Sequence, residues 1–360
     1  MNYYWILLLF ILLLCYKNKG RTSVLILCLT LFFVFFAYRV GFTPDYLNYL
    51  DSFKINHIQT SVDENIQEEI GFQWLCMVLP SYRALLIVQT LFYCSCLYIA
   101  LRWYISPRYW WLSFLTLFLY EPFVLGNISG MRSGYVTCFF FYAILLKNEF
   151  AKKGLVASLF LMYLAFLFHK SAIILVPLLF IPNKPLNNSI KYIVYVLALF
   201  FIIISLLYPN ELNAIGIALT ENYFSDTYYM TYFNEKLDAE YSLFSLLKSF
   251  ILSVLLYITL ECTQKEKSPH KNLFIKYTAF FYLLVLAPSS IGLITRFYYY
   301  FAFPVIIGTY YIIECVPFKK ALVYMGCMGL YAFWQMYNLY HGEVVMQFFS
   351  KYDNLLFHIF

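Results

Sequence analysis

The arginines at the edges of apolar segments are the residues of this sequence whose type and position most clearly suggest anion binding or ion pairing. Arg39, Arg132 and Arg296 each stand beside a long apolar run. A guanidinium binds planar anions such as carboxylate and phosphate through paired hydrogen bonds. Because an unpaired charge is costly in apolar surroundings, these arginines indicate either ion pairs or a site for an anion.

The segment 121–134 links two apolar runs with almost no loop between them. Arg132 is therefore expected at the start of a helix, where the backbone amides of the first turn also favour an anion. A salt bridge to Glu121 is the alternative. We favour an anion site, with Arg296 as a second guanidinium at the start of a later apolar run.

Two carboxylates precede or follow these apolar runs. Asp45 follows Arg39 by six residues, so the two either form an ion pair or bind a phosphate and a sugar hydroxyl, with Tyr49 beside Asp45. Glu69 stands just before an apolar stretch. It either begins a helix, where the dipole favours a negative charge, or places a carboxylate over a site.

His169 and Lys170 interrupt an otherwise apolar stretch. An imidazole changes protonation near neutral pH and serves as a general base, while an ammonium binds phosphate. The alternative is a polar elbow between two short helices.

The polar stretch 208–241 combines aromatic and acidic residues. Aromatic faces stack on sugar rings, and carboxylates accept hydrogen bonds from sugar hydroxyls. The alternative places the aromatic side chains at the level of the lipid headgroups. The candidate sugar contacts here are Tyr228, Tyr229 and Tyr232.

The composition identifies the class of protein that must position these residues. The chain has 360 residues, of which 62% are hydrophobic and 12% charged, against ~45–50% and ~25% in ordinary soluble domains. This excludes a soluble enzyme, a disordered chain, a disulfide-knit secreted domain and a basic nucleic-acid binder. The sequence also lacks a P-loop, an HExxH motif and histidines at metal-ligand spacing, so we expect no cofactor and no metal.

We therefore predict an all-α polytopic integral membrane protein with about 11–12 transmembrane helices of ~20 residues each. Residues 1–360 would form a single transmembrane domain, with longer outer loops at about 39–82 and 208–241. The run 171–182 is short for a full span. The apolar segments lie near 2–16, 22–38, 83–101, 109–126, 128–146, 154–168, 171–182, 190–207, 242–260, 273–292, 296–315 and 321–338.

The distribution of lysines predicts the orientation. With the N-terminus outside, lysine-rich segments such as 147–153 and 265–276 face the cytoplasm, as the positive-inside rule requires. Both long polar stretches then face the periplasm or the cell exterior. Arg39, Arg83, Arg132 and Arg296 fall at the outer ends of spans, against that rule.

The motifs together resemble those of the EpsG/Wzy group of bacterial polysaccharide polymerases, which make O-antigen, capsule and exopolysaccharide. The resemblance covers most of the chain and is carried by Arg39-x5-Asp45-x3-Tyr49, Glu69-x-Gly71-Phe72, Met131-Arg132, Phe168-His169-Lys170-Ser171-Ala172 and Arg296. One departure is Ser133, where the family often has Gln after the arginine.

The resemblance implies a GT-C-like glycosyltransferase of the bacterial inner membrane with its site on the periplasmic or exterior side. Its donor and acceptor would be undecaprenyl-diphosphate-linked glycans, with membrane lipid and a chain-length regulator as further partners and no nucleic acid. His169 or Asp45, with Glu69 as second choice, would activate the acceptor hydroxyl. Arg132 and Arg296 would bind the diphosphate, supported by Arg39 and Lys170, and Tyr49 would contact sugar.

Other classes remain open at this stage. A flippase or transporter of lipid-linked oligosaccharides also needs a cationic cavity, but its charges are expected deep within several spans. An O-antigen ligase or another GT-C glycosyltransferase would use similar groups.

Overall fold

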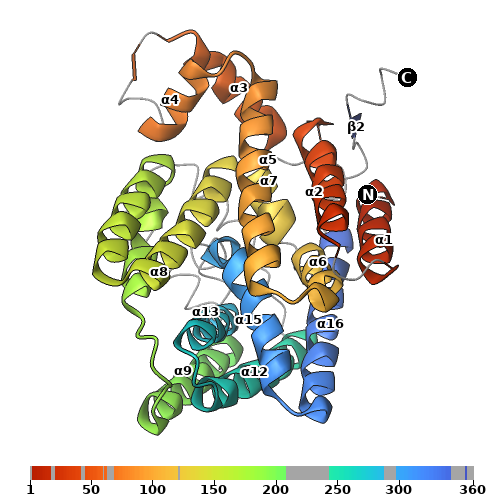
Figure 1. Cartoon of the computed structure of the whole chain (residues 1–360), viewed down its shortest axis with the longest axis vertical. Coiled ribbons are helices and arrows are strands. Elements are labelled where there is room, and N and C mark those ends of the chain that lie inside the picture. The colour runs from red at the N-terminus through yellow and green to blue at the C-terminus, as the bar shows by residue number, and fades with distance from the viewer. Residues whose placement is uncertain are drawn as a thin grey trace. The chain divides into compact units, whose positions relative to one another are not determined.

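The described part of the chain is almost entirely helical (Figure 1). The computed structural model describes residues 2–17, 21–41, 45–59, 61–62, 69–120, 122–207, 243–287, 297–341 and 353–354. The chain divides into two compact units, one formed by Met1–Pro182 with Phe333–Phe360 and the other by Asn183–Ala332. The predicted outer stretch 208–241 lies outside the described residues.

The first unit begins with apolar helices that pack through aromatic side chains. Helix α1 (Asn2–Lys17) packs on α6 (Trp110–Leu119), and α2 (Thr22–Ala37) packs on α5 (Tyr82–Ile99). Phe32 is fully buried and stacks on the Tyr93 ring at 5.9 Å. A π-helical turn (Ala100–Tyr104) and a 3₁₀ turn (Pro107–Tyr109) lead from α5 into α6.

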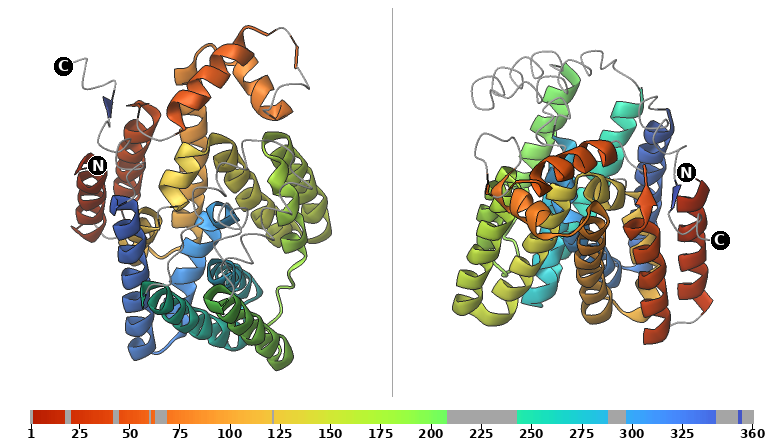
Figure 2. Two further views of the ribbon diagram at one scale, coloured as in Figure 1. Left: turned by 180° about the vertical axis from the view of Figure 1, so that it is seen from behind. Right: turned by 90° about the horizontal axis from the view of Figure 1, so that it is seen from above.

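The stretch 39–82, expected as a long outer loop, contains two helices of its own. Helix α3 (Tyr46–His57) packs against α4 (Ile70–Val78), and both lie at one end of α5 (Figures 1 and 2). Phe53, Phe72 and Tyr82 form the core between them. A short antiparallel pair joins β1 (Arg39–Val40) to β2 (Asp353–Asn354).

The helix that contains α6 is broken after Leu119. The segments Pro107–Leu119 and Phe123–Ser129 meet at 68°, and the second consists of a π-helical turn (Pro122–Gly126) and α7 (Asn127–Ser129). A break leaves carbonyl groups without helical partners, which is tolerated in a membrane protein only where other groups satisfy them. Here Tyr93 Oη donates to Phe123 O at 2.5 Å, and Gln89 Nε2 donates to Asn127 O at 2.9 Å.

Helix α8 (Met131–Phe168) is a hairpin. Ser158 Oγ donates to Ala143 O at 2.6 Å, although fifteen residues would extend about 22 Å along a straight helix. The chain therefore reverses between the two, in the lysine-containing segment where the sequence predicts a turn between 128–146 and 154–168. After His169 the chain continues as a 3₁₀ helix, η4 (Lys170–Phe180), over the short run 171–182.

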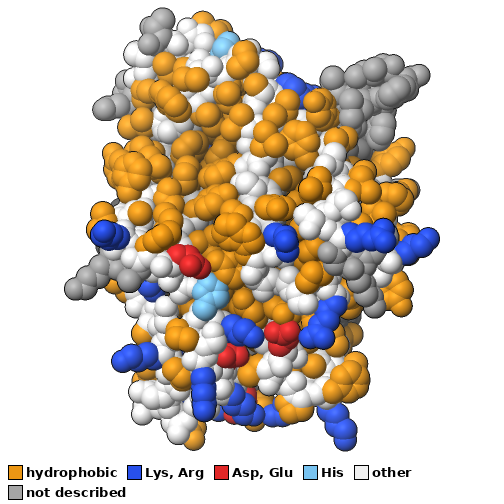
Figure 3. All heavy atoms as spheres, in the orientation of Figure 1, with side chains coloured by type: hydrophobic (Ala, Val, Ile, Leu, Met, Phe, Trp, Pro, Cys, Tyr) orange, Lys and Arg blue, Asp and Glu red, His pale blue; other side chains and the backbone are white. Residues whose placement is uncertain are grey.

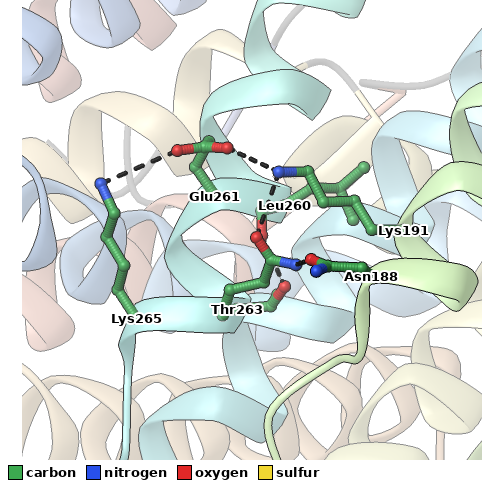
Figure 4. A network of polar contacts seen from close by, with 7 residues as sticks. Asn188, Lys191, Leu260, Glu261, Thr263 and Lys265 are labelled. Carbon is green, nitrogen blue, oxygen red and sulfur yellow. Dashed lines mark hydrogen bonds and ion pairs between the residues drawn. The ribbon is translucent and has the colours of Figure 1, made fainter.

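The second unit is a helical bundle. Helix α13 (Pro269–Leu286) packs between α12 (Leu243–Lys265) and α15 (Ala302–Cys315), which follows the 3₁₀ turn Tyr298–Phe301. The chain then enters α16 (Phe318–His341). A polar network fastens α9 (Asn188–Leu207) to α12, because Lys191 Nζ bonds Glu261 at 2.6 Å and Gln264 at 3.1 Å (Figure 4).

Apolar helices of sufficient length to span a membrane are fewer than the apolar segments of the sequence. Within the described ranges, Tyr82–Tyr104 and Leu246–Lys265 suffice alone, and the bent pair 107–129 would be a third. Others, such as Thr22–Ala37, have 10–17 residues, and sixteen residues reach only about 24 Å of a ~30 Å hydrocarbon core. Hydrophobic side chains cover much of the face in Figure 3. The helical content and apolar surface are compatible with an all-α membrane protein.

Candidate functional site

A buried carboxylate joins three segments that the sequence singles out separately. Glu69 Oε2 accepts from Arg132 Nη1 at 2.5 Å, and Glu69 Oε1 lies 2.7 Å from His169 Nδ1. The backbone N–H of Lys170 donates to Oε1 at 3.3 Å. These contacts cross 63 and 100 residues of sequence, so the site forms only when the first unit folds.

The hairpin of α8 brings Arg132 and His169 together. Arg132 is the second residue of α8, and His169 caps its C-terminal end. Because the chain reverses within α8, the two ends of this element lie close together. Glu69 reaches them from the N-cap position of α4, as the sequence expects for an acid at a helix start.

Gly71 permits the close approach that this geometry needs. A Cβ atom at Gly71 would lie 2.8 Å from Leu167 O, closer than a side-chain carbon tolerates. Helix α4 therefore packs directly on the backbone of α8 two residues before His169. A residue without a side chain is therefore needed at position 71, two residues after Glu69.

The partners of Glu69 hold its pKa low and so favour the ionised carboxylate at neutral pH. Burial acts to raise its pKa, because only 8% of the side chain is exposed, but the His169 hydrogen bond and the Arg132 charge lower the pKa from 4.5 to about 2. A carboxylate only accepts hydrogen bonds, so Nδ1 of neutral His169 must carry the proton. The lone pair of neutral His169 is then on Nε2.

Tyr49 and Asp45 approach the same region from α3. The Arg132 guanidinium lies 6.0 Å from the centre of the Tyr49 ring, which packs edge-on against Phe72 at 5.5 Å. Burial raises the pKa of Tyr49, opposed by the Arg132 charge. Asp45 Oδ2 accepts from Ser129 Oγ at 3.1 Å, which ties the start of α3 to α7.

Arg39 is fully buried, and the protein itself supplies acceptors for its guanidinium. It donates to Phe36 O at 2.6 Å, Ile128 O at 3.0 Å and Gln89 Oε1 at 3.3 Å. Arg83 adds a bond to Arg39 O at 3.0 Å. These bonds tie α2 and α5 to the broken helix just before Arg132, which favours a positioning role for Arg39 over direct phosphate contact.

The remaining predicted residues divide by their place in the structure. Lys170 has an exposed side chain beside the cluster. The candidates Arg296, Tyr228, Tyr229 and Tyr232 lie outside the described residues. Glu121, the alternative partner of Arg132, also lies outside them. Their predicted roles stay predictions. Among the described residues, no group of three His, Cys, Asp or Glu side chains is arranged to hold a metal ion.

Sequence reasoning did not single out Gln89 or Ser129, although both help to form the site. Gln89 lies in an apolar helix and bonds both Arg39 and the carbonyl of Asn127. A glutamine within an apolar segment is the one signal that could have indicated it, because a buried amide needs partners.

A family model decides the relationship to known proteins. The EpsG family model matches residues 21–354, which include Glu69, Arg132 and His169. The chain belongs to the EpsG family. Membership confirms the resemblance carried by the motifs and supports a role of the polysaccharide-polymerase type in a membrane. No curated protein and no solved structure matches the chain.

Proposed function

We propose that this EpsG-family protein polymerises undecaprenyl-diphosphate-linked repeat units into O-antigen, capsule or exopolysaccharide. The observation that carries the proposal is the Glu69 carboxylate, which holds an imidazole and a guanidinium side by side in a buried site. An imidazole with a fixed tautomer serves as a base, and a guanidinium beside it stabilises a phosphate that leaves.

The reaction is a displacement at an anomeric carbon. The acceptor hydroxyl oxygen of one lipid-linked repeat unit attacks the anomeric carbon that joins the growing glycan to its lipid carrier. The bond between that carbon and the phosphate oxygen breaks, and its electron pair leaves with the lipid diphosphate. The hydroxyl proton passes to Nε2 of His169, a general-base step that typically contributes ~10²–10⁴-fold to the rate.

The geometry refines the roles that the sequence left open. Glu69 acts as a positioning residue, because it is ionised and bonded on both oxygens. His169 is the base, and Asp45 orients the acceptor from the start of α3. Arg132 contacts the leaving diphosphate, with exposed Lys170 beside it.

The other expected residues extend the site. Arg296 supplies a second cation. Sugar rings contact Tyr49 and, from the loop 208–241, Tyr228, Tyr229 and Tyr232. Arg39 supports the site by holding α7 in place through its bond to Ile128 O.

The proposal includes a membrane placement. The chain would cross the bacterial inner membrane about 11–12 times in a GT-C-like arrangement, with shorter helices spanning through tilt and bends. The site would open to the periplasm or exterior. The lysine-rich segments at the opposite ends of the predicted spans support this orientation.

Complementation of a polymerase-null strain tests the proposal. His169→Ala and Arg132→Ala should abolish the ladder of long glycans at normal protein level, and single repeat units should accumulate outside the inner membrane. His270→Ala, on α13 of the second unit, is the matched control and should keep the ladder. A wild-type ladder in both site variants would refute the proposal, and accumulation of repeat units inside would indicate a flippase instead.

A further inference from the structure

Helix α4 presents an apolar stripe that no described part of the protein covers. Ile70, Trp74 and Val78 recur every four residues on one face and are 48%, 56% and 58% exposed. The opposite face carries Gly71, Phe72 and Cys76, which are buried against α3 and α8. Both faces of α4 are therefore largely apolar.

The neighbouring helix α3 carries charged side chains on its exposed surface. Asp51 and Lys54 form an ion pair on α3 at 2.9 Å, with side chains 67% and 61% exposed. Helix α4 contains no charged residue at all. The exposed surface of α3 thus combines charged side chains with the apolar Leu47 and Ile55, whereas the exposed face of α4 is apolar throughout.

The packing of α4 favours lipid as the surroundings of this apolar stripe. Through Gly71, α4 packs on the end of the apolar helix Lys153–Phe168, which exposes large side chains such as Phe160 and Tyr163. Both α4 and this helix of the first unit therefore expose large apolar side chains. With nine residues, α4 is only about 13 Å long and cannot cross a bilayer. Tryptophan is also enriched where hydrocarbon meets headgroups.

We infer that α4 lies in the outer interface of the bilayer, with Ile70, Trp74 and Val78 inserted among the lipid chains. Interfacial helices of this kind bury their apolar face about 5–10 Å deep. Glu69, at the N-cap of α4, then holds Arg132 and His169 at the level of the headgroups. That is the depth at which the diphosphate of a lipid-linked glycan lies, so α4 sets the height of the site in the membrane.

Fluorescence quenching in proteoliposomes tests the placement. The wild type has six tryptophans. The emission of Trp74 is therefore obtained as the fluorescence of the wild type minus that of a Trp74→Phe variant. Lipids brominated near the headgroup end of their chains should remove most of this difference emission, and lipids brominated near the bilayer centre should remove less. Aqueous iodide should leave it unchanged.

Trp110 supplies the matched control. It is 1% exposed and its Nε1 donates to Leu101 O at 2.9 Å, so the difference emission from Trp110→Phe should resist both quenchers. Quenching of Trp74 by iodide and not by brominated lipid would overturn the inference in favour of water. Resistance of Trp74 to both quenchers would also overturn it, because protein would then cover the stripe.

The inference rests on the membrane placement in the proposed function and not on the reaction. The quenching experiment needs no substrate and no activity. A water-exposed Trp74 together with glycan ladders that depend on His169 would refute the inference alone. A lipid-quenched Trp74 with ladders that do not depend on His169 would refute the reaction alone.

Discussion

Replacement of Glu69 by Gln removes one charge from the centre of the site while keeping the shape of the side chain. The pKa of Glu69 falls from 4.5 to about 2 in the folded chain, which corresponds to about 3 kcal/mol of stability from the ionised form. Because the folded pKa is the lower one, this stability is present above pH 4.5. It is lost progressively as the pH falls from about 4.5 towards 2.

Thermal unfolding of the purified protein in detergent measures this effect. A thiol-reactive dye reports unfolding, because Cys76 and Cys138 are free thiols buried in the first unit. The wild type should lose thermal stability steeply below pH 4.5. Glu69→Gln should be less stable than wild type at pH 7 and should show a flatter acid dependence, because it has no carboxylate left to protonate.

Asp51→Asn is the matched control for the loss of a carboxylate in the same unit. Asp51 is two-thirds exposed and paired only with Lys54, and such surface pairs contribute about 0–1 kcal/mol. The control should therefore follow the wild type at every pH. The reasoning is refuted if Glu69→Gln matches the wild type both in stability at pH 7 and in its acid dependence.

Two further substitutions test the packing that supports the site. Gly71→Ala should lower thermal stability by about 1–3 kcal/mol, because its Cβ would press on Leu167 O at 2.8 Å; Gly326→Ala, which meets nothing within 4 Å, is the control and should be neutral. Arg39→Lys should cost about 1–3 kcal/mol in the same dye assay, because one ammonium cannot satisfy the buried acceptors that the guanidinium reaches. Unchanged melting of Gly71→Ala, or of Arg39→Lys, would show that the close contact or the buried hydrogen bonds are not needed.

The sequence predicts the helical segments well where charge interrupts apolar residues. The turn within α8 is the clearest case, because lysines at 147, 152 and 153 separate two apolar runs and the Ser158–Ala143 bond confirms the reversal. The number of spans is harder to predict. Hydropathy sums apolar residues along the chain, whereas breaks such as the 68° bend before α7 shorten the helices that form.

The members of the site could be named from the sequence, but their partners could not. Arg132, His169 and Glu69 each stand out as a polar residue at the end of an apolar run. Nothing local indicates that one carboxylate serves both others, because the contacts cross 63 and 100 residues. The nearest acid in sequence, Glu121, was the natural alternative for Arg132, and only the packing of α4 on α8 brings Glu69 there.

The outer stretch 39–82 shows a second limit of hydropathy. Helices α3 and α4 are too short or too polar to register as spans, so the stretch resembles a loop in sequence. Their helical form follows from packing, since Phe53 and Phe72 are buried between them. Tertiary contacts, rather than local propensity, stabilise such short helices.

In the proposed reaction, the Glu69–Arg132–His169 cluster has a consequence for charge balance. With His169 neutral, the carboxylate and the guanidinium offset each other, and the three side chains carry no net charge. When Nε2 takes the proton of the acceptor, the cluster becomes cationic in the same step in which the departing diphosphate gains negative charge. The attraction for the leaving group therefore grows as the bond breaks and disappears when the proton is released, which lets the spent lipid carrier leave the site.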